Sequence, residues 1–426
     1  MPQEPNEFSS LHDWLRYIEK VNPKEIELGL NRIDRVFQTL NIKLDFLIIT
    51  VAGTNGKGST CAFLESIYFS AKYNVACYTS PHLFKFNERI KVNKVPCCDQ
   101  DIVNSLNLIN SKRMGVPLTY FEITTLAAMH IFSQKKVDVA ILEIGLGGRL
   151  DAVNLFDPAV SIITSIALDH QDYLGNTVEE IALEKGGIFR PNKHAIINTK
   201  NEKNILVRHG EKINSQVSQL DTDYSIKDNK DSLSYLGGEY SFINLPYPKL
   251  EGNMQIQNLA GVLRVVELLE HKFPVTKESI KLGILNTNLI GRLDVVSKKP
   301  LIVFDVAHNQ EAANNLSKFI VKSKNNGRVF GVFSILLDKD IDSVIMPFIK
   351  LVDEWFISAI DHTRAQKVDV IKLALKKMNK TTPIHIADNL LQAYKNAYKK
   401  TSLDDNIIVF GSFFTVREII KENYND

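Results

Sequence analysis

Residues 46–60 decide the fold and read FLIITVAGTNGKGST. The apolar, β-branched first half predicts a buried strand, and the hydroxyl-rich end predicts the start of a helix. Between them, glycines let backbone N–H groups face an anion, Lys57 can reach terminal phosphates, and Ser59 or Thr60 can offer a hydroxyl to magnesium. The stretch therefore predicts a cradle for a polyphosphate. The structural alternative is a glycine-rich turn with a surface lysine.

Length and composition set the class of protein. The chain has 426 residues, enough for roughly two to four domains. It holds 51 basic and 49 acidic residues, so charge alone favours neither nucleic acid nor a membrane as a partner. The four cysteines are too few to staple the chain, and the first eight residues resemble no signal peptide. No uncharged apolar run approaches the roughly 18 residues of a membrane span. We expect a soluble cytoplasmic protein with reduced thiols.

The first half of the chain alternates strands and helices. Short apolar runs predict buried parallel strands at Leu47–Val51, Val75–Thr79, Val137–Ile144 and Val160–Ala167. Helical patterns lie between them at Thr60–Ala71, Asp101–Ser111, Thr124–Lys135 and Thr177–Phe189. Thr177 is a predicted N-cap because Glu180 follows it at the capping-box spacing. The pattern predicts a doubly wound α/β domain.

A second alternation fills the last third of the chain. Strands are predicted at Leu301–Val306, Val329–Phe333, Glu354–Ile360, Ile384–Ala387 and Asn406–Phe410. Helices are predicted at Gln310–Lys322, Ile341–Leu351, Val368–Met378, Asn389–Lys399 and Thr415–Glu422. These elements predict a second, Rossmann-like α/β domain.

The domain boundaries follow from these patterns. We predict a phosphate-loop domain over residues 1–288, a hinge over 289–296 and a C-terminal domain over 297–426. Between about Asn198 and Pro248 the pattern becomes polar, with short alternating pieces such as Ser234–Phe242. This region predicts antiparallel strands added to the first sheet, and the sequence gives it no chemical role.

The phosphate loop departs from the common GxxxxGK[ST] pattern, because Gly58 separates Lys57 from Ser59 and Val51 stands at the first glycine position. With this inserted glycine, residues 51–59 resemble the ATP loop of the folylpolyglutamate synthase and dihydrofolate synthase family, relatives of the Mur ligases. The resemblance implies that ATP meets the whole loop: Gly53, Thr54, Asn55, Gly56, Lys57, Gly58, Ser59 and Thr60.

Residues just after the strands are the next candidates, because doubly wound sheets bind ligands at the carboxyl ends of their strands. Ser80 can bind magnesium or cap a turn before Pro81. Glu143, at the end of an apolar strand, can bind a hard cation or pair with Arg149. The family's signatures are similar at both places, which implies metal roles for Ser80 and Glu143.

Two further metal ligands are implied by the resemblance. His170 follows the strand that ends near Ala167, and the family's Asp-His pair there supplies a magnesium ligand. Lys185 ends a predicted helix, where a lysine is ordinarily a solvated charge. The matching family lysine is carbamylated and serves a second magnesium. The family's glycine-rich signature also resembles residues 143–154, with Val153 in place of threonine, and implies substrate contacts by Arg149 and Asp151.

The second half carries the remaining candidates. Asn258 lies in a stretch similar to the family's helix-opening motif, which implies an ATP contact. Arg292, in the predicted hinge, is either a solvated linker residue or, by resemblance, a phosphate ligand. Asp305 and His308 follow a predicted strand, and the resemblance implies a nucleotide contact and a catalytic role. Residues 338–340 and 411–412 also match the family and are taken as structural markers.

These residues predict an ATP-dependent amide ligase. Lys57 would steady the transferred phosphoryl group, two magnesium ions would neutralise the polyphosphate, and a substrate carboxylate would become an acyl phosphate. The amine of glutamate would then attack, with Lys57, Lys185 and His308 as catalytic residues. Closure of the second domain would exclude water. The resemblance implies dihydropteroate or reduced folate, L-glutamate and ATP as substrates, and we expect a monomer.

Three alternatives remain at this point. The chain can be a polyglutamate synthase only, or a Mur-type ligase, although the loops of Mur ligases usually lack the extra glycine. A GTP-binding switch is a third class. Such switches read guanine with Asn-Lys-x-Asp, and the nearest stretches, residues 93–96 and 229–232, lack the final aspartate.

Overall fold

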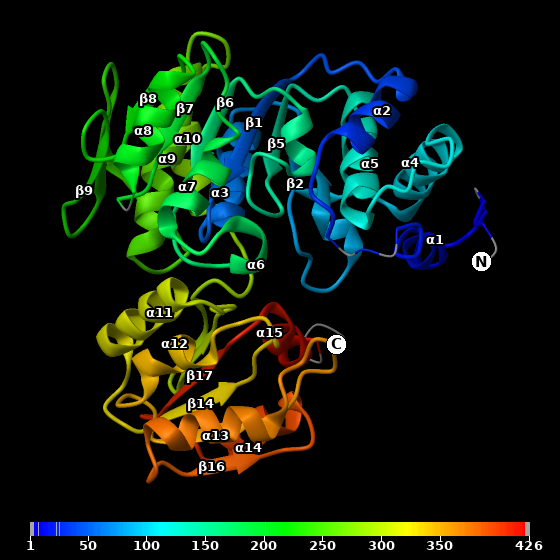
Figure 1. The fold of residues 1–426 in the computed structure, drawn as a ribbon. Helices are drawn as coiled ribbons and strands as arrows, with labels where there is room; N and C mark the ends of the chain where they lie inside the picture. Colours follow the sequence, from blue (N-terminus) through cyan, green and yellow to red (C-terminus); the bar gives the residue numbers. More distant parts are fainter. Residues whose placement is uncertain (1–3, 7, 23, 25, 201, 422–426) are drawn as a thin grey trace. The chain divides into compact units, whose positions relative to one another are not determined.

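A computed structural model describes residues 4–6, 8–22, 24, 26–200 and 202–421. The described chain divides into two compact units, which are described separately (Figure 1). Unit 1 holds the described parts of residues 1–167, 171–249 and 256–287. Unit 2 holds residues 168–170, 250–255 and the described residues from 288 onward. Glu422, the last residue of one predicted helix, lies outside the described residues.

Unit 1 is built on an eight-stranded sheet of order β4-β3-β2-β5-β1-β6-β7-β8 (Figure 1). Its strands are β1 (Leu47–Ala52), β2 (Val75–Tyr78), β3 (Ile90–Val92), β4 (Val95–Pro96), β5 (Val139–Glu143), β6 (Val160–Ile163), β7 (His194–Ile197) and β8 (Gln216–Gln219). The six strands from β2 to β8 are parallel, and β3 and β4 continue the sheet antiparallel. The carboxyl ends of the parallel strands therefore meet at one edge.

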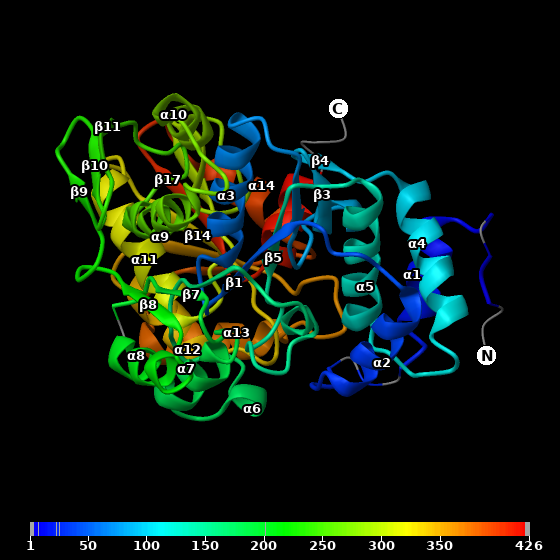
Figure 2. The same ribbon diagram turned by 90° about the horizontal axis from the view of Figure 1, so that it is seen from above.

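Helices cover both faces of this sheet (Figure 2). The helices of this part of the chain, some of which pack on other helices, are α1 (Leu11–Ile18), α2 (Asn31–Leu40), α3 (Lys57–Ser70), α4 (Asp99–Lys112), α5 (Tyr120–Gln134), α6 (Gln171–Leu174), α7 (Val178–Gly186), α8 (Lys203–Lys212), α9 (Asn253–Leu269) and α10 (Lys277–Leu285), with 3-10 turns η1 (Phe86–Arg89) and η2 (Ala152–Leu155). The predicted Thr177 cap of α7 is confirmed, because Thr177 and Glu180 form a reciprocal capping box. Within the described residues, no helix is long and apolar enough to cross a membrane.

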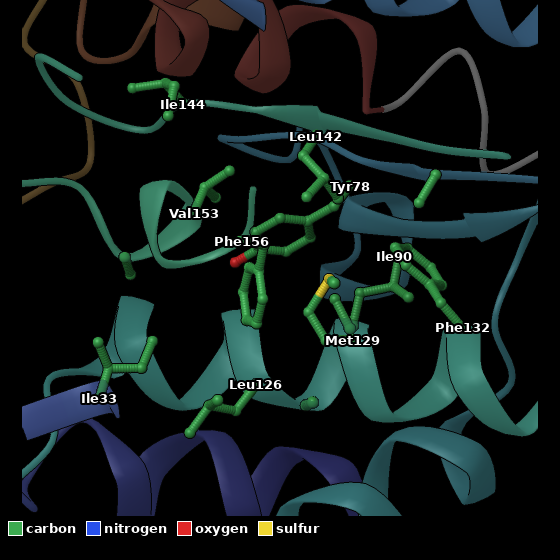
Figure 3. Close-up of a cluster of buried hydrophobic side chains, with 14 of the residues drawn as sticks. Ile33, Tyr78, Ile90, Leu126, Met129, Phe132, Leu142, Ile144, Val153 and Phe156 are labelled. Atoms are coloured by element: carbon green, nitrogen blue, oxygen red, sulfur yellow. The ribbon is translucent and has the colours of Figure 1, made fainter. Parts of the chain in front are cut away.

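The core of unit 1 lies where α5 packs on the sheet. Figure 3 shows Leu126 and Met129 of α5 facing Tyr78 and Leu142 of the strands, with Phe156 between them. These side chains are almost fully buried. Burying them contributes roughly 1.5–3 kcal/mol each, which fixes the strands whose ends carry the site.

The prediction of antiparallel strands added to the first sheet is wrong. Strands β9 (Ser225–Asp228), β10 (Leu233–Leu236) and β11 (Ser241–Leu245) form a separate three-stranded antiparallel sheet. Among the described residues of this region, only those of β8 join the main sheet, and they do so in parallel. Alternating residues such as those of β10 predict a half-buried strand, but they do not say which sheet the strand joins.

Unit 2 contains a six-stranded sheet of order β12-β13-β17-β14-β15-β16. Its strands are β12 (Asp294–Lys298), β13 (Leu301–Phe304), β14 (Val329–Phe333), β15 (Glu354–Ile357), β16 (Ile384–Ile386) and β17 (Asn406–Phe410). Its helices are α11 (Gln310–Ser323), α12 (Ile341–Ile345), α13 (Val368–Met378), α14 (Leu390–Lys400) and α15 (Phe413–Ile420), with the 3-10 turn η3 (Met346–Phe348). The predicted second α/β layer is confirmed, and the antiparallel edge strand β12 is an addition.

Two differences between the predicted and the observed elements concern the phosphate loop. Helix α3 begins at Lys57, three residues earlier than predicted, so the phosphate-loop lysine is itself helical. Strand β6 ends at Ile163 instead of Ala167. Residues 164–167 leave the sheet because their backbone and side chains bond to the phosphate loop.

Candidate active site

The phosphate loop joins β1 to α3 in unit 1. Gly53 has φ +150° and Gly56 has φ +85°, and Gly56 is the N-cap of α3. The N-cap residue, a glycine, has no side chain that could cap α3, and an α-helix leaves the N–H groups of its first turn without partners inside the helix. The loop thus has the open backbone donors that a phosphate requires.

Three polar side chains belong to this loop and the first turn of α3. The Lys57 ammonium donates to the carbonyls of Gly53 (2.8 Å) and Thr54 (3.2 Å). The hydroxyls of Ser59 and Thr60 are buried and have no hydrogen-bond partner among the described residues. A buried hydroxyl without a partner is costly, so these two groups are available to bind a polar ligand.

Two residues that the sequence did not single out hold the loop in shape. Thr164 Oγ1 donates to the Asn55 carbonyl (2.6 Å), and the Asn55 N–H donates to Ser165 Oγ (2.9 Å). A Cβ on Gly53 would collide with the Thr164 hydroxyl. Polar residues just after a strand were the available signal, but the strand was predicted to continue through them.

Asn258 lies against the loop from α9. It is almost fully buried, and a Cβ on Gly56 would lie 2.6 Å from its Oδ1. The structure thus brings Asn258 beside the loop, some 200 residues away in sequence.

Glu143 and Ser80 meet at the ends of β5 and β2. The Ser80 N–H donates to Glu143 Oε2 (3.0 Å), and Glu143 is buried. The alternative of a Glu143–Arg149 salt bridge is wrong, because Arg149 pairs with Glu184 at 2.7 Å. Glu143 and Ser80 are therefore placed together by the sheet.

The loop after β5 packs on the end of α7. A Cβ on Gly148 would lie 2.6 Å from the Glu184 carbonyl and 2.8 Å from that of Lys185. Lys185 is 4% exposed, so its interpretation as a solvated charge is wrong. Asp151 is buried and accepts hydrogen bonds from the N–H groups of Leu146 (2.8 Å) and Val153 (2.9 Å).

Burial raises the pKa of Asp151 to about 7, although these hydrogen bonds lower it. Arg149, in contrast, is exposed. Of the two predicted substrate residues, Asp151 thus holds the loop and Arg149 lies at its surface.

The residues present fit magnesium better than a metal that needs a nitrogen or sulfur cage. In the described chain, no three His, Cys, Asp or Glu side chains gather as a ready metal site. A buried carboxylate and unpaired hydroxyls are hard oxygen donors, and magnesium commonly takes few protein ligands plus substrate phosphates. Ser80 and Glu143 belong to unit 1 and His170 to unit 2, so their grouping stays a prediction.

Unit 2 carries Arg292 and Asp305. The Arg292 guanidinium lies 4.6 Å from the centre of the Phe413 ring, so this residue is packed rather than solvated. Asp305 accepts hydrogen bonds from the N–H groups of Leu293 and Ala307, each at 2.7 Å. Burial raises the pKa of Asp305 to about 6, although Arg292 lowers it.

A cluster of charges in unit 2 surrounds Asp169. Lys339 Nζ lies 2.7 Å from its carboxylate, and the Nε2 atoms of His170 and His308 lie 3.9 and 3.8 Å from it. Burial alone would raise the pKa of Asp169, but its neighbours His170, His308 and Lys339 lower it well below its usual value. Lys339, taken above as a structural marker, is buried in this cluster.

His308 is held in one orientation. Its Nδ1 lies 2.8 Å from the Val306 carbonyl, and burial together with Lys339 lowers its pKa to about 4. The imidazole is therefore neutral at neutral pH.

The chain is similar to known proteins over nearly its whole length. Residues 51–265 match the Mur ligase middle domain, and residues 291–413 match the Mur ligase glutamate ligase domain. The chain is 36% identical to the dihydrofolate synthase/folylpolyglutamate synthase of Haemophilus influenzae, over 96% of this chain and 97% of that protein. The Escherichia coli protein of the same name is also 36% identical, over 98% and 96%.

The chain belongs to the dihydrofolate synthase/folylpolyglutamate synthase family of Mur ligases. Solved structures agree. Escherichia coli FolC in complex with DHPP and ADP has a TM-score of 0.93 at 35% identity, covering 99% of both chains. A bifunctional synthase with Mn, AMPPNP and L-glutamate bound has a TM-score of 0.90 at 34% identity, covering 99% of this chain and 100% of that one.

These comparisons confirm three predictions from the sequence: the family, the two-domain α/β fold and the enzyme class. A synthase of this family is an ATP-dependent ligase of folate synthesis and polyglutamylation, and so is this chain. The nucleotide switch is thereby set aside.

Proposed function

We propose that one chain performs both ligations: L-glutamate is joined to dihydropteroate, which gives dihydrofolate, and to reduced folates, which gives polyglutamates. The main observation behind this proposal is the phosphate loop. Its helix has a glycine N-cap, two of its buried hydroxyls have no hydrogen-bond partner among the described residues, and Asn258 packs against it. Relatives named for both activities, similar over nearly the whole chain, support it.

The substrate carboxylate attacks the γ-phosphorus of ATP, ADP leaves, and an acyl phosphate forms. Lys57 leaves its two loop carbonyls and places its ammonium on the transferred phosphoryl group. The glutamate amine then attacks the acyl carbon, phosphate leaves with the bonding electrons, and the amine loses a proton. We assign Arg292 and Asp305 to the nucleotide and His308, neutral as it is held, to the step in which glutamate attacks.

We assign metal ligation to Ser59, Ser80, Glu143 and His170, with two magnesium ions. The ions would supply charge neutralisation for the polyphosphate. Lys185, buried on the last turn of α7 beside the loop that follows Glu143, would serve as a carbamate, formed when its amine adds to CO2 and releases a proton. Divalent metal in a similar structure supports the ions, and the carbamate is a prediction from the sequence.

We propose a cytoplasmic monomer. The four cysteines, all within the described residues, are free thiols, which fits a reducing compartment. Size-exclusion chromatography with light scattering tests the monomer.

Product analysis tests the function. Purified protein is incubated with ATP, magnesium and glutamate, once with dihydropteroate and once with tetrahydrofolate, and products are identified by mass spectrometry. Glutamate adducts of both acceptors are expected. An adduct of tetrahydrofolate alone would reduce the function to polyglutamylation, and none with either acceptor would redirect the search to Mur-type acceptors.

Two variants test the assigned residues. Lys57→Ala is expected to lower kcat/KM for ATP by about 100- to 1000-fold, because a positioned cation at the phosphoryl group is lost. Lys72→Ala, at an exposed lysine just beyond α3, is the matched control and is expected to act like wild type. Glu143→Gln is expected to raise the magnesium concentration needed for half-maximal activity. An unchanged magnesium titration would contradict its metal role.

A further inference from the structure

The region between β7 and α9 contains none of the residues assigned to the reaction. Asn198 follows β7 directly, at the same sheet edge as the phosphate loop, and is fully buried. A fully buried amide needs partners for both its oxygen and its nitrogen. Where these partners lie decides what the region does.

Asn198 holds the first turns of α9 through a reciprocal pair. Its Nδ2 donates to the Gln257 carbonyl (2.8 Å), and Gln257 Nε2 donates to the Asn198 carbonyl (2.7 Å). One turn further, a Cβ on Gly261 would lie 2.7 Å from Asn198 Cγ. Helix α9 therefore packs directly against Asn198, and the contact is made by Gln257, the residue before Asn258.

Tyr224 is the second hydrogen-bond partner of the Asn198 side-chain amide. Its hydroxyl donates to Asn198 Oδ1 (2.9 Å), and Tyr224 is 2% exposed. With Gln257 on one side and Tyr224 on the other, the amide of Asn198 has a donor and an acceptor partner and a single orientation. A rigid amide of this kind fixes the helix that it bonds to.

The three-stranded sheet packs against Tyr224 and also contacts α9 directly, at a place other than Asn198. The Tyr224 ring lies 6.4 Å from that of Tyr235 on β10, and the Tyr235 hydroxyl donates to Glu267 Oε2 of α9 (2.6 Å). Glu267 also pairs with Arg264 (2.8 Å) and accepts from the N–H of Glu239 in the β10–β11 turn (2.7 Å). Figure 2 shows this sheet beside α9.

The position of α9 matters because Asn258 leaves no room at the loop. Its Oδ1 would lie 2.6 Å from a Cβ on Gly56, so the side chain is already packed against the backbone of the N-cap residue. A small displacement of the helix changes the space that a nucleotide meets there.

We propose that Asn198 and Tyr224 are positioning residues for ATP, which hold Asn258 against the phosphate loop, and that the three-stranded sheet is the support of this arrangement. The inference rests on the proposed nucleotide role of Asn258. It assigns a function to a region for which the sequence indicated none, and it predicts an effect on ATP without an effect on glutamate.

Asn198→Asp and Tyr224→Phe test the inference with almost no change in volume. The first variant keeps the acceptor for Tyr224 but removes the donor to Gln257, and the second removes only the hydroxyl. Each is expected to raise KM for ATP and Kd for ADP by about tenfold or more. Asn198→Asp places a second acceptor against the Gln257 carbonyl, and Tyr224→Phe removes a hydroxyl that contacts both Asn198 Oδ1 and the Ile197 carbonyl. The value of kcat is expected to stay within about twofold, and KM for glutamate to stay unchanged.

Two further variants calibrate this result. Tyr247→Phe is the matched control, because the Tyr247 hydroxyl donates to Asp228 of the same sheet without reaching α9, and its KM for ATP is expected to equal that of wild type. Asn258→Ala is the reference for loss of the contact itself. Calorimetric titration with ADP and steady-state kinetics are measured for all four.

The outcomes separate the two levels of the proposal. If Asn258→Ala raises KM for ATP and Tyr224→Phe does not, the positioning role is wrong while the nucleotide site stands. If Asn258→Ala leaves KM for ATP unchanged, the assigned nucleotide contact itself fails. A parallel fall in kcat, or a rise in KM for glutamate, would show general destabilisation and overturn the inference. Tyr224→Phe retains the test if Asn198→Asp does not fold.

Discussion

Gly56 connects the backbone geometry of the phosphate loop to the nucleotide site, and Gly56→Ala tests that connection. The residue has φ +85° and precedes the first residue of α3. An alanine there meets two separate penalties. One is the left-handed backbone, and the other is the side chain of Asn258.

Both penalties can be estimated from the structure. A left-handed conformation costs a residue with a Cβ about 1–2 kcal/mol. The added Cβ would lie 2.6 Å from Asn258 Oδ1 and 3.0 Å from Nδ2. Comfortable contact lies near 3.5 Å, so Asn258 has to move by about 1 Å. Misplacement of this size commonly lowers kcat/KM by about 100-fold.

Gly115→Ala separates the two effects. Gly115 has φ +78°, and nothing lies within 4 Å of the position that its Cβ would take. Gly115→Ala is expected to lower the free energy of unfolding by about 1–2 kcal/mol, and Gly56→Ala to lower it by at least as much, because its Cβ also meets Asn258. Only Gly56→Ala is expected to lose ATP affinity.

Urea denaturation and calorimetric titration with ADP provide the two measurements. Wild-type ADP affinity in Gly56→Ala would refute the contact with Asn258. An equal loss of affinity in Gly115→Ala would show that backbone strain alone is responsible.

Two further predictions concern charges. Lys91→Met leaves the Glu65 carboxylate, 2.8 Å from Lys91 Nζ and 3% exposed, without its partner, so urea denaturation should show a loss of about 3–5 kcal/mol that Lys91→Arg largely restores. Burial alone would lower the pKa of Lys91, but Glu65 raises it; the pair should therefore stabilise fully below pH 10.5 and weaken as pH rises further. For His308, burial and Lys339 lower the pKa from 6.5 to about 4, so its stabilisation is present above pH 6.5 and is lost as pH falls toward 4. An NMR titration should show a neutral ring at pH 6, and a midpoint near 6.5 would contradict this environment.

The sequence by itself determined the local features of this protein. Its β-branched runs and the helical patterns between them gave both α/β layers, and Thr177 with Glu180 marked the start of α7. These signals are readable because they depend on residues a few positions apart. The phosphate loop is also a local feature, because its strand, glycines, Lys57 and hydroxyls lie in one contiguous stretch of sequence.

Only the tertiary structure decided which distant residues meet. Lys339 is bonded to Asp169 across 170 positions, and Lys185 is buried although it ends a helix in a way typical of a solvated charge. Nothing in the sequence distinguishes Asn198 from other polar residues, and its role follows only from its hydrogen bond to Gln257 of α9. The sequence around a polar side chain is the same whether that side chain contacts water or a residue far along the chain. Which of the two it contacts depends on the folded structure, because only folding brings distant residues together.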